Sequence, residues 1–138
     1  MNENRPRILV VDDEPDICWA LENILGPAGC AVTTCSCGKE ALDLITGEVY
    51  SIVFVDAKLP DQNGLELAAL IRQNRPEADV ILISGYYYNE DSTIQEGMEQ
   101  NLFLGFIAKP FDVHEVRLLV RRALQEKGWK DVANTDCR

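Results

Sequence analysis

The sequence predicts an α/β protein built on one parallel β-sheet with helices on both faces. Strand-length apolar runs alternate along the chain with segments whose apolar residues recur every three or four positions. The run at 51–55, SIVFV, is apolar throughout, which is typical of a central strand covered on both sides. Because each connection between strands has room for a helix, the strands are expected to be parallel.

Five segments have the length and composition of strands. They are rich in β-branched residues and are mostly continuous in their apolar character. The predicted strands span residues 7–11, 30–35, 51–55, 80–83 and 105–108. The second of them is the most polar, which favours a position near an edge of the sheet.

Five helices are predicted between and after these strands. The first begins near Pro15 and is stopped by the GPAG segment at 26–29. The second carries apolar residues at 41–45 and is closed by Gly47, and the third covers 65–71 after a turn rich in Pro, Asn and Gly.

The last two helices have signals of different strength. A weak helical pattern joins Ile94, Met98 and Leu102 after a loop that contains three consecutive tyrosines. Asp112 and Glu115 have the spacing of a capping box, which predicts the start of a final helix.

Length and composition indicate one ordinary domain. The chain has 138 residues, with 23 acidic and 13 basic side chains and a net charge of -10. Such a balance argues against a direct nucleic-acid partner or an anionic membrane surface, since phosphate binding needs a basic footprint. With no signal-peptide or transmembrane pattern, we expect a cytoplasmic protein with a domain at 5–126 and a short tail at 127–138, and no output domain.

The cysteines follow no metal-binding or disulfide pattern. Their number is five, which is odd, no two form a Cys-x-x-Cys pair, and His114 is the only histidine. We therefore expect free thiols and no zinc site.

Polar side chains follow four of the five predicted strands. Asp12 and Asp13 come after the first strand, Asp56 after the third, Ser84 after the fourth and Lys109 after the fifth. Ligands of open parallel sheets bind at the carboxyl ends of the strands, so these residues predict a site at that edge.

The chemistry of these residues implies that either one carboxylate stays protonated or a cation lies among them. Neighbouring carboxylates repel by about 1 to 4 kcal/mol per pair, and one lysine cannot offset three of them. Hard oxygen ligands favour Mg²⁺ or Ca²⁺, and a compact cluster completed by water suits Mg²⁺. A lysine and a serine hydroxyl facing such a site could hold a phosphoryl group.

The ordered motifs resemble the receiver domain of two-component response regulators over residues 5–126. The segments that carry the resemblance are VVDDEPD, IVFVDAKLPDQNG, ILISG and GFIAKPF. The resemblance implies a doubly wound, flavodoxin-like three-layer sandwich with five helices and strand order 2-1-3-4-5.

The resemblance also assigns roles around the acidic cluster. It implies that Asp56 is the phosphoacceptor. It implies that Mg²⁺ is held directly by Asp13, mostly through water by Asp12, and also by Asp56 and the backbone carbonyl of Lys58.

Three further residues are implied to bind or sense the phosphoryl group. Lys109 would pair with its oxygens and Ser84 would move its hydroxyl toward it. Phe106 would then turn inward, and the face made by the fourth helix, fifth strand and fifth helix would change its affinity for partners.

The implied function is a phosphoacceptor signalling domain that catalyses only its own phosphorylation and dephosphorylation. Its expected partners are a sensor histidine kinase or phosphotransfer protein, an unidentified downstream protein, and a second copy of the chain upon phosphorylation. The receiver could stand alone or belong to a longer regulator.

The alternative is a Mg²⁺-dependent aspartyl-phosphate phosphatase, but that class expects an aspartate where this chain has Lys58. A flavin protein of the same fold is disfavoured because DDEPD would repel the flavin phosphate.

Overall fold

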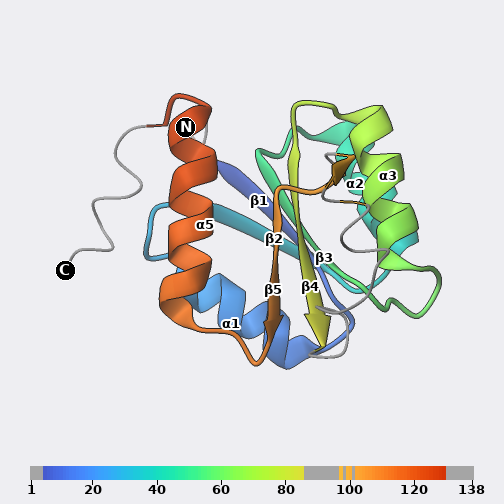
Figure 1. Cartoon of the computed structure of the whole chain (residues 1–138), viewed down its shortest axis with the longest axis horizontal. Coiled ribbons are helices and arrows are strands. Elements are labelled where there is room, and N and C mark those ends of the chain that lie inside the picture. Colours follow the sequence, from blue (N-terminus) through green and yellow to red (C-terminus); the bar gives the residue numbers. More distant parts are fainter. Residues whose placement is uncertain (1–4, 86–96, 98, 101, 130–138) are drawn as a thin grey trace.

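The chain forms a five-stranded parallel sheet in the order β2-β1-β3-β4-β5, which confirms the predicted fold class (Figure 1). The computed structural model describes residues 5–85, 97, 99–100 and 102–129. The strands are β1 (Arg7–Val11), β2 (Ala31–Cys35), β3 (Ile52–Asp56), β4 (Asp79–Gly85) and β5 (Gly105–Lys109). β2 lies at one edge and is mostly half-buried, in agreement with its polar composition.

Four helices lie within the described residues, one fewer than expected. They are α1 (Pro15–Leu25), α2 (Gly38–Gly47), α3 (Gly64–Asn74) and α5 (Val113–Glu126). The remaining prediction concerns the segment around Ile94 and Met98, which lies outside the described residues, although Gly97 and Glu99 within it are helical. In the part of the chain that is described, no helix combines the length and apolarity needed to cross a membrane.

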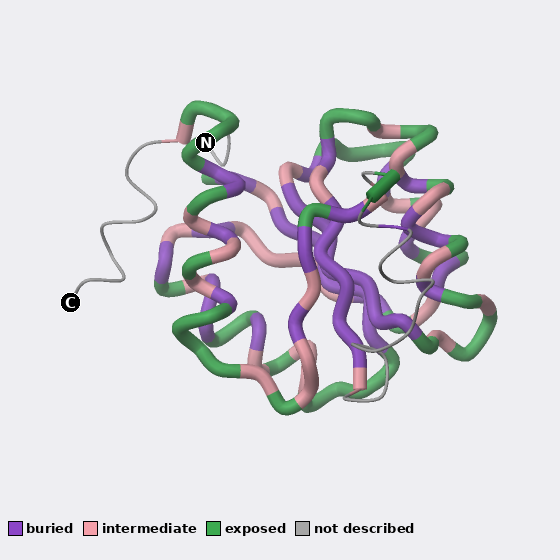
Figure 2. The backbone as a smooth tube through the Cα atoms, in the orientation of Figure 1, coloured by how far each residue is buried: buried purple, intermediate pink, exposed green. Residues whose placement is uncertain are grey.

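The helices cover the sheet in two layers, α1 and α5 on one face and α2 and α3 on the other (Figure 1). Alternate residues of β1 pack on opposite sides: Leu9 and Val11 join the α2–α3 side, whereas Ile8 and Val10 join the α1–α5 side. The strands are consequently buried along most of their length (Figure 2). This double coverage explains the continuous apolar runs and leaves the strand ends as the place for polar chemistry.

The helices begin where local signals predict. Pro15 occupies the start of α1, where its missing N–H costs no hydrogen bond. The side chains of Asn63 and Asp112 accept hydrogen bonds from Leu65 N and His114 N at 2.7 and 2.8 Å. These caps fix where α3 and α5 begin, near the edge of the sheet that carries the polar residues.

The chain after α5 turns back onto the domain. Gly128 has a φ of 98°, which favours glycine, and Trp129 N donates to Leu124 O at 3.0 Å. The Trp129 side chain is half-buried against the core on the α1–α5 side. The packed part of the described chain therefore includes the first residues beyond the last helix.

Candidate functional site

The register of β1 and β3 brings two aspartates together. Val11 pairs with Val55, so the residues that follow them, Asp12 directly after β1 and Asp56 at the end of β3, lie at the same level of the sheet. Asp13 follows at the same edge. One ligand oxygen from each of the three carboxylates can be chosen so that all lie within 4.8 Å of one another. The structure therefore brings Asp56 next to the adjacent pair Asp12 and Asp13, which lies more than forty positions earlier in the sequence.

The same register places the hydroxyl and the ammonium group at this edge. Asp56 pairs with Ile83, so Ser84 follows it on the neighbouring strand, and Ser84 in turn pairs with Ala108, which precedes Lys109. Ser84 is fully buried, and among the described residues its Oγ has no hydrogen-bond partner. A buried hydroxyl without a partner costs about 1 to 3 kcal/mol, so its retention here favours a ligand-binding use.

Lys109 connects the carboxylates. Its Nζ lies 3.2 Å from Asp56 Oδ2 and 3.3 Å from Asp12 Oδ2, and it donates to Glu14 Oε1 at 2.5 Å. Burial alone would lower the pKa of this ammonium, but the bond to Glu14 and the two buried carboxylates outweigh it, so the pKa is raised. Lys109 is therefore held in its charged form.

The cluster nevertheless keeps an excess of negative charge. Asp12 is 1% exposed, and its burial raises its pKa to about 6. The hydrogen bond from Glu14 N lowers this pKa, whereas the charge of Asp56 raises it. One ammonium among four carboxylates leaves a net negative charge, which a divalent cation would balance. Ligand atoms that are all oxygen fit a hard cation such as Mg²⁺.

The other residues with expected roles lie around this cluster. Lys58 N donates to Asp56 Oδ1 at 3.1 Å, and the Lys58 side chain is exposed. Phe106 is half-buried on β5, pairs with Leu82 and packs against the core on the α2–α3 side. Ser84 and Lys109 thus share the edge with the acidic cluster, whereas Phe106 lies further back along its strand.

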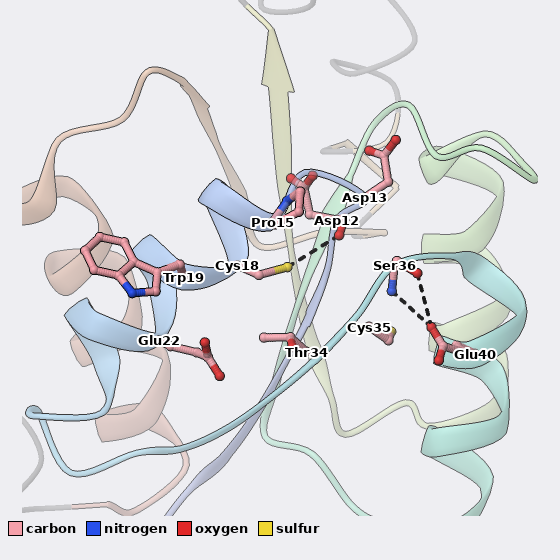
Figure 3. Close-up of a pocket in the computed structure, with 10 residues that line it drawn as sticks. All are labelled: Asp12, Asp13, Pro15, Cys18, Trp19, Glu22, Thr34, Cys35, Ser36 and Glu40. Atoms are coloured by element: carbon pink, nitrogen blue, oxygen red, sulfur yellow. Dashed lines mark hydrogen bonds between the residues drawn. The ribbon is translucent and has the colours of Figure 1, made fainter.

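A hollow of about 460 Å³ opens beside the cluster, between α1 and β2 (Figure 3). Asp12 and Asp13 form part of its lining, and Trp19, which is 66% exposed, projects from α1. Two cysteines also line it, but burial raises the pKa of Cys18 to about 11 and that of Cys35 to about 12. These thiols stay protonated at neutral pH and are poor nucleophiles.

Asp61 links the loop after Asp56 to the start of α2 through two hydrogen bonds. Gly38 N donates to Asp61 Oδ1 at 2.9 Å and Lys39 N to Asp61 Oδ2 at 3.0 Å. The residue before α2, Cys37, makes no side-chain cap of its own. Asp61 therefore caps a helix that is remote in sequence and steadies the loop that begins next to Asp56.

Replacement of Asp61 should release the start of α2. Asp61→Ala removes both acceptors, whereas Asp61→Asn keeps one, so amide hydrogen exchange at Gly38 and Lys39 should accelerate most in the alanine variant. The hydrogen bonds from Gly38 and then from Lys39 lower the pKa of Asp61 below its ordinary 3.8. The cap is accordingly complete above pH 3.8 and is lost as the pH falls through the lowered value. Equal exchange rates in all three proteins would contradict this role.

Two contacts of the site have no signal in the sequence. Glu14 belongs to an acidic stretch, but nothing in its spacing indicates a bond to Lys109, 95 residues away. Asp61 lies in a segment predicted only as a turn, and its bond to α2 depends on how two loops meet.

Comparisons with known proteins match the chain to signalling regulators. The family model "Response regulator receiver domain" matches residues 8–136. The chain is 36% identical over 122 residues to the response regulator protein PilR of Pseudomonas aeruginosa, covering 88% of the chain and 27% of PilR. It is 33% identical over 127 residues to sporulation initiation phosphotransferase F of Bacillus subtilis, covering 92% of the chain and 98% of that protein.

A solved structure of a response regulator also resembles the chain. The response regulator protein TrrA from Thermotoga maritima, in complex with Mg²⁺-BeF, superposes with a TM-score of 0.74 at 31% identity and covers 86% of the chain and 98% of TrrA. Several curated relatives are much longer than the matched region, since the chain spans 27% of PilR and 24% of the NtrC regulators it matches.

Proposed function

Because the chain belongs to the family of response regulator receiver domains, we propose that Asp56 accepts a phosphoryl group from a phosphohistidine. The donor would be a sensor histidine kinase or a phosphotransfer protein, as in two-component signalling. The observation that carries the assignment is the position of Asp56 in an acidic cluster, with its Oδ2 3.2 Å from Lys109 Nζ. An aspartate in this setting is a nucleophile that meets compensating positive charge.

The proposed step is a phosphoryl transfer between two side chains. A carboxylate oxygen of Asp56 forms a bond to phosphorus, the phosphorus–nitrogen bond of the phosphohistidine breaks, and the imidazole leaves with the bonding electron pair. Such transfer needs positioning and charge neutralisation more than a proton acceptor. Lys109 supplies one positive charge, and the buried Ser84 hydroxyl is available to donate a hydrogen bond.

A magnesium ion is part of this proposal. Asp12, Asp13 and Asp56 would hold it through side-chain oxygens, and the carbonyl of Lys58 would complete the protein ligands. When bound, Mg²⁺ would neutralise charge on the phosphoryl oxygens. The excess of carboxylates over ammonium groups supports this choice of metal, as does the fact that the described candidate ligands are all carboxylate oxygens.

The proposed output is a change of binding surface. When Ser84 moves its hydroxyl to the phosphoryl group, Phe106 turns inward and alters the surface formed by the segment after β4, by β5 and by α5. A downstream protein or a second copy of the chain would bind this surface. The proposal takes residues 5–126 as the receiver, with 127–138 as a tail, in a cytoplasmic protein that either acts alone or forms part of a longer regulator.

Labelling with a small acyl phosphate tests the proposed chemistry. Incubated with the donor and Mg²⁺, the chain should gain the mass of one phosphoryl group, and the modified peptide should contain Asp56. Removal of Mg²⁺ with a chelator should reduce the labelling to background, because the carboxylates would then repel the incoming phosphate.

The alternative phosphatase activity has a different signature in the same assay. A phosphatase would release phosphate from several phosphate esters over many turnovers and would accumulate little label. Sustained turnover of external substrates would therefore contradict the receiver assignment.

A further inference from the structure

Among the described residues, Glu14 makes the shortest ion pair with Lys109. The bond between Lys109 Nζ and Glu14 Oε1 is 2.5 Å long, compared with 3.2 Å to Asp56 Oδ2 and 3.3 Å to Asp12 Oδ2. Glu14 occupies the N-cap position of α1, but its side chain makes no capping bond to that helix. The carboxylate is therefore committed to the lysine rather than to local helix structure.

The three carboxylates that hold Lys109 lie at different depths. The side chains of Asp12 and Asp56 are 0% and 8% exposed, whereas that of Glu14 is 58% exposed. The Lys109 side chain is 20% exposed and lies between the buried carboxylates, Asp12 and Asp56, and the exposed one, Glu14. Since an ammonium has only three protons to donate, a bond to Glu14 takes one away from any ligand bound at Asp56.

We propose that Glu14 is a positioning residue that competes with the phosphoryl group for Lys109 and supports the metal site. This inference rests on the proposed function. By binding the ammonium more closely than Asp12 and Asp56 do, Glu14 limits how far it moves in between those two carboxylates, where it would oppose a metal cation. The Glu14 charge attracts the cation as well, and it repels an incoming phosphoryl group.

The two effects predict shifts of opposite sign when Glu14 loses its charge. Without the Glu14 carboxylate, Mg²⁺ meets a less negative site and a lysine that can lie deeper, so its affinity falls. A phosphoryl group instead gains a lysine with no competing acceptor and loses a repulsive neighbour, so its affinity rises. If Glu14 had only a structural role, its replacement would weaken the binding of both Mg²⁺ and the phosphoryl group.

Calorimetric titration of the full chain tests this with Mg²⁺ alone and then with beryllofluoride at saturating Mg²⁺. For Glu14→Gln we expect Mg²⁺ to bind about three- to tenfold more weakly and beryllofluoride about two- to fivefold more tightly, as a screened unit charge near a site would produce. Asp16→Asn is the matched control: it removes one exposed carboxylate from the same end of α1, and Asp16 is not among the described partners of Lys109.

A second variant separates the contact from the charge. Glu14→Asp keeps the charge but shortens the reach, so it should keep most of the Mg²⁺ affinity and still bind beryllofluoride more tightly than the native chain. Parallel weakening of both ligands in Glu14→Gln, values equal to those of Asp16→Asn, or a Glu14→Asp protein identical to the native one would overturn the inference. Failure of the native chain to bind beryllofluoride with Mg²⁺ would instead contradict the proposed function itself.

Discussion

Asp56→Asn should reduce phosphoryl labelling to background while the fold is retained. The amide is nearly the same size as the carboxylate, but it is a poor nucleophile and carries no charge to bind the cation. The side chain is buried at the end of β3 and contacts Lys109, so no neighbouring carboxylate can take its place without moving its strand. The measurement is the phosphorylated fraction by intact mass after incubation with an acyl phosphate and Mg²⁺.

Two controls make this result specific to the site. Asp43→Asn removes an exposed carboxylate from α2 and should label like the native chain. Circular dichroism of Asp56→Asn without Mg²⁺ should show a cooperative unfolding transition, because the variant removes one of several mutually repelling charges. Normal labelling of Asp56→Asn, with the modification mapped to another residue, would refute the assignment of the acceptor.

The edge of the sheet is predictable because strands and helices alternate regularly. In a parallel sheet with a helix in each connection, the carboxyl ends of all strands must meet at one edge. The alternating pattern alone therefore assigns residues directly after strands, such as Asp56 and Lys109, to this edge. Their distances depend on register, and the pairing of Val11 with Val55 supplies it.

Contacts made by flexible side chains and loops are not predictable in the same way. Glu14 reaches Lys109 because the loop after β5 comes close to the start of α1, which no periodicity encodes. Asp61 caps α2 across 22 and 23 residues because two loops converge. Both contacts depend on tertiary geometry at single residues, whereas the fold depends on patterns repeated over many.

A glycine next to the acceptor has a structural role that its turn-like sequence does not reveal. The sequence predicts that Gly64 belongs to a turn, but in the structure it is the buried first residue of α3. Its N–H donates to Ala57 O at 2.9 Å, which holds the helix start directly against the strand end. A Cβ at this position would lie 2.8 Å from Ala57 Cα and even closer to the backbone oxygen of Asp56. Only glycine fits this approach without movement of the backbone.

Gly64→Ala should therefore destabilise the domain and also impair the site. Overpacking against backbone atoms should cost about 1 to 3 kcal/mol of unfolding free energy, because neither the helix start nor the strand end can move cheaply. Any relief that shifts the Asp56 backbone also shifts its carboxylate relative to Lys109, 3.2 Å away. We expect labelling to fall well below the fraction of chains that remain folded, as judged by chemical denaturation and by intact mass.

Asn63→Ala separates lost stability from a displaced acceptor. It removes the 2.7 Å hydrogen bond to Leu65 N and should cost about 1 kcal/mol at the same helix start, but it adds no atom near Asp56. Its folded fraction should label at the native rate. Gly47→Ala, at an open position with no atom within 4 Å of the new Cβ, should leave both stability and labelling close to native. If Gly64→Ala labels in proportion to its folded fraction, as Asn63→Ala should, then the close approach of α3 to Asp56 matters for folding alone.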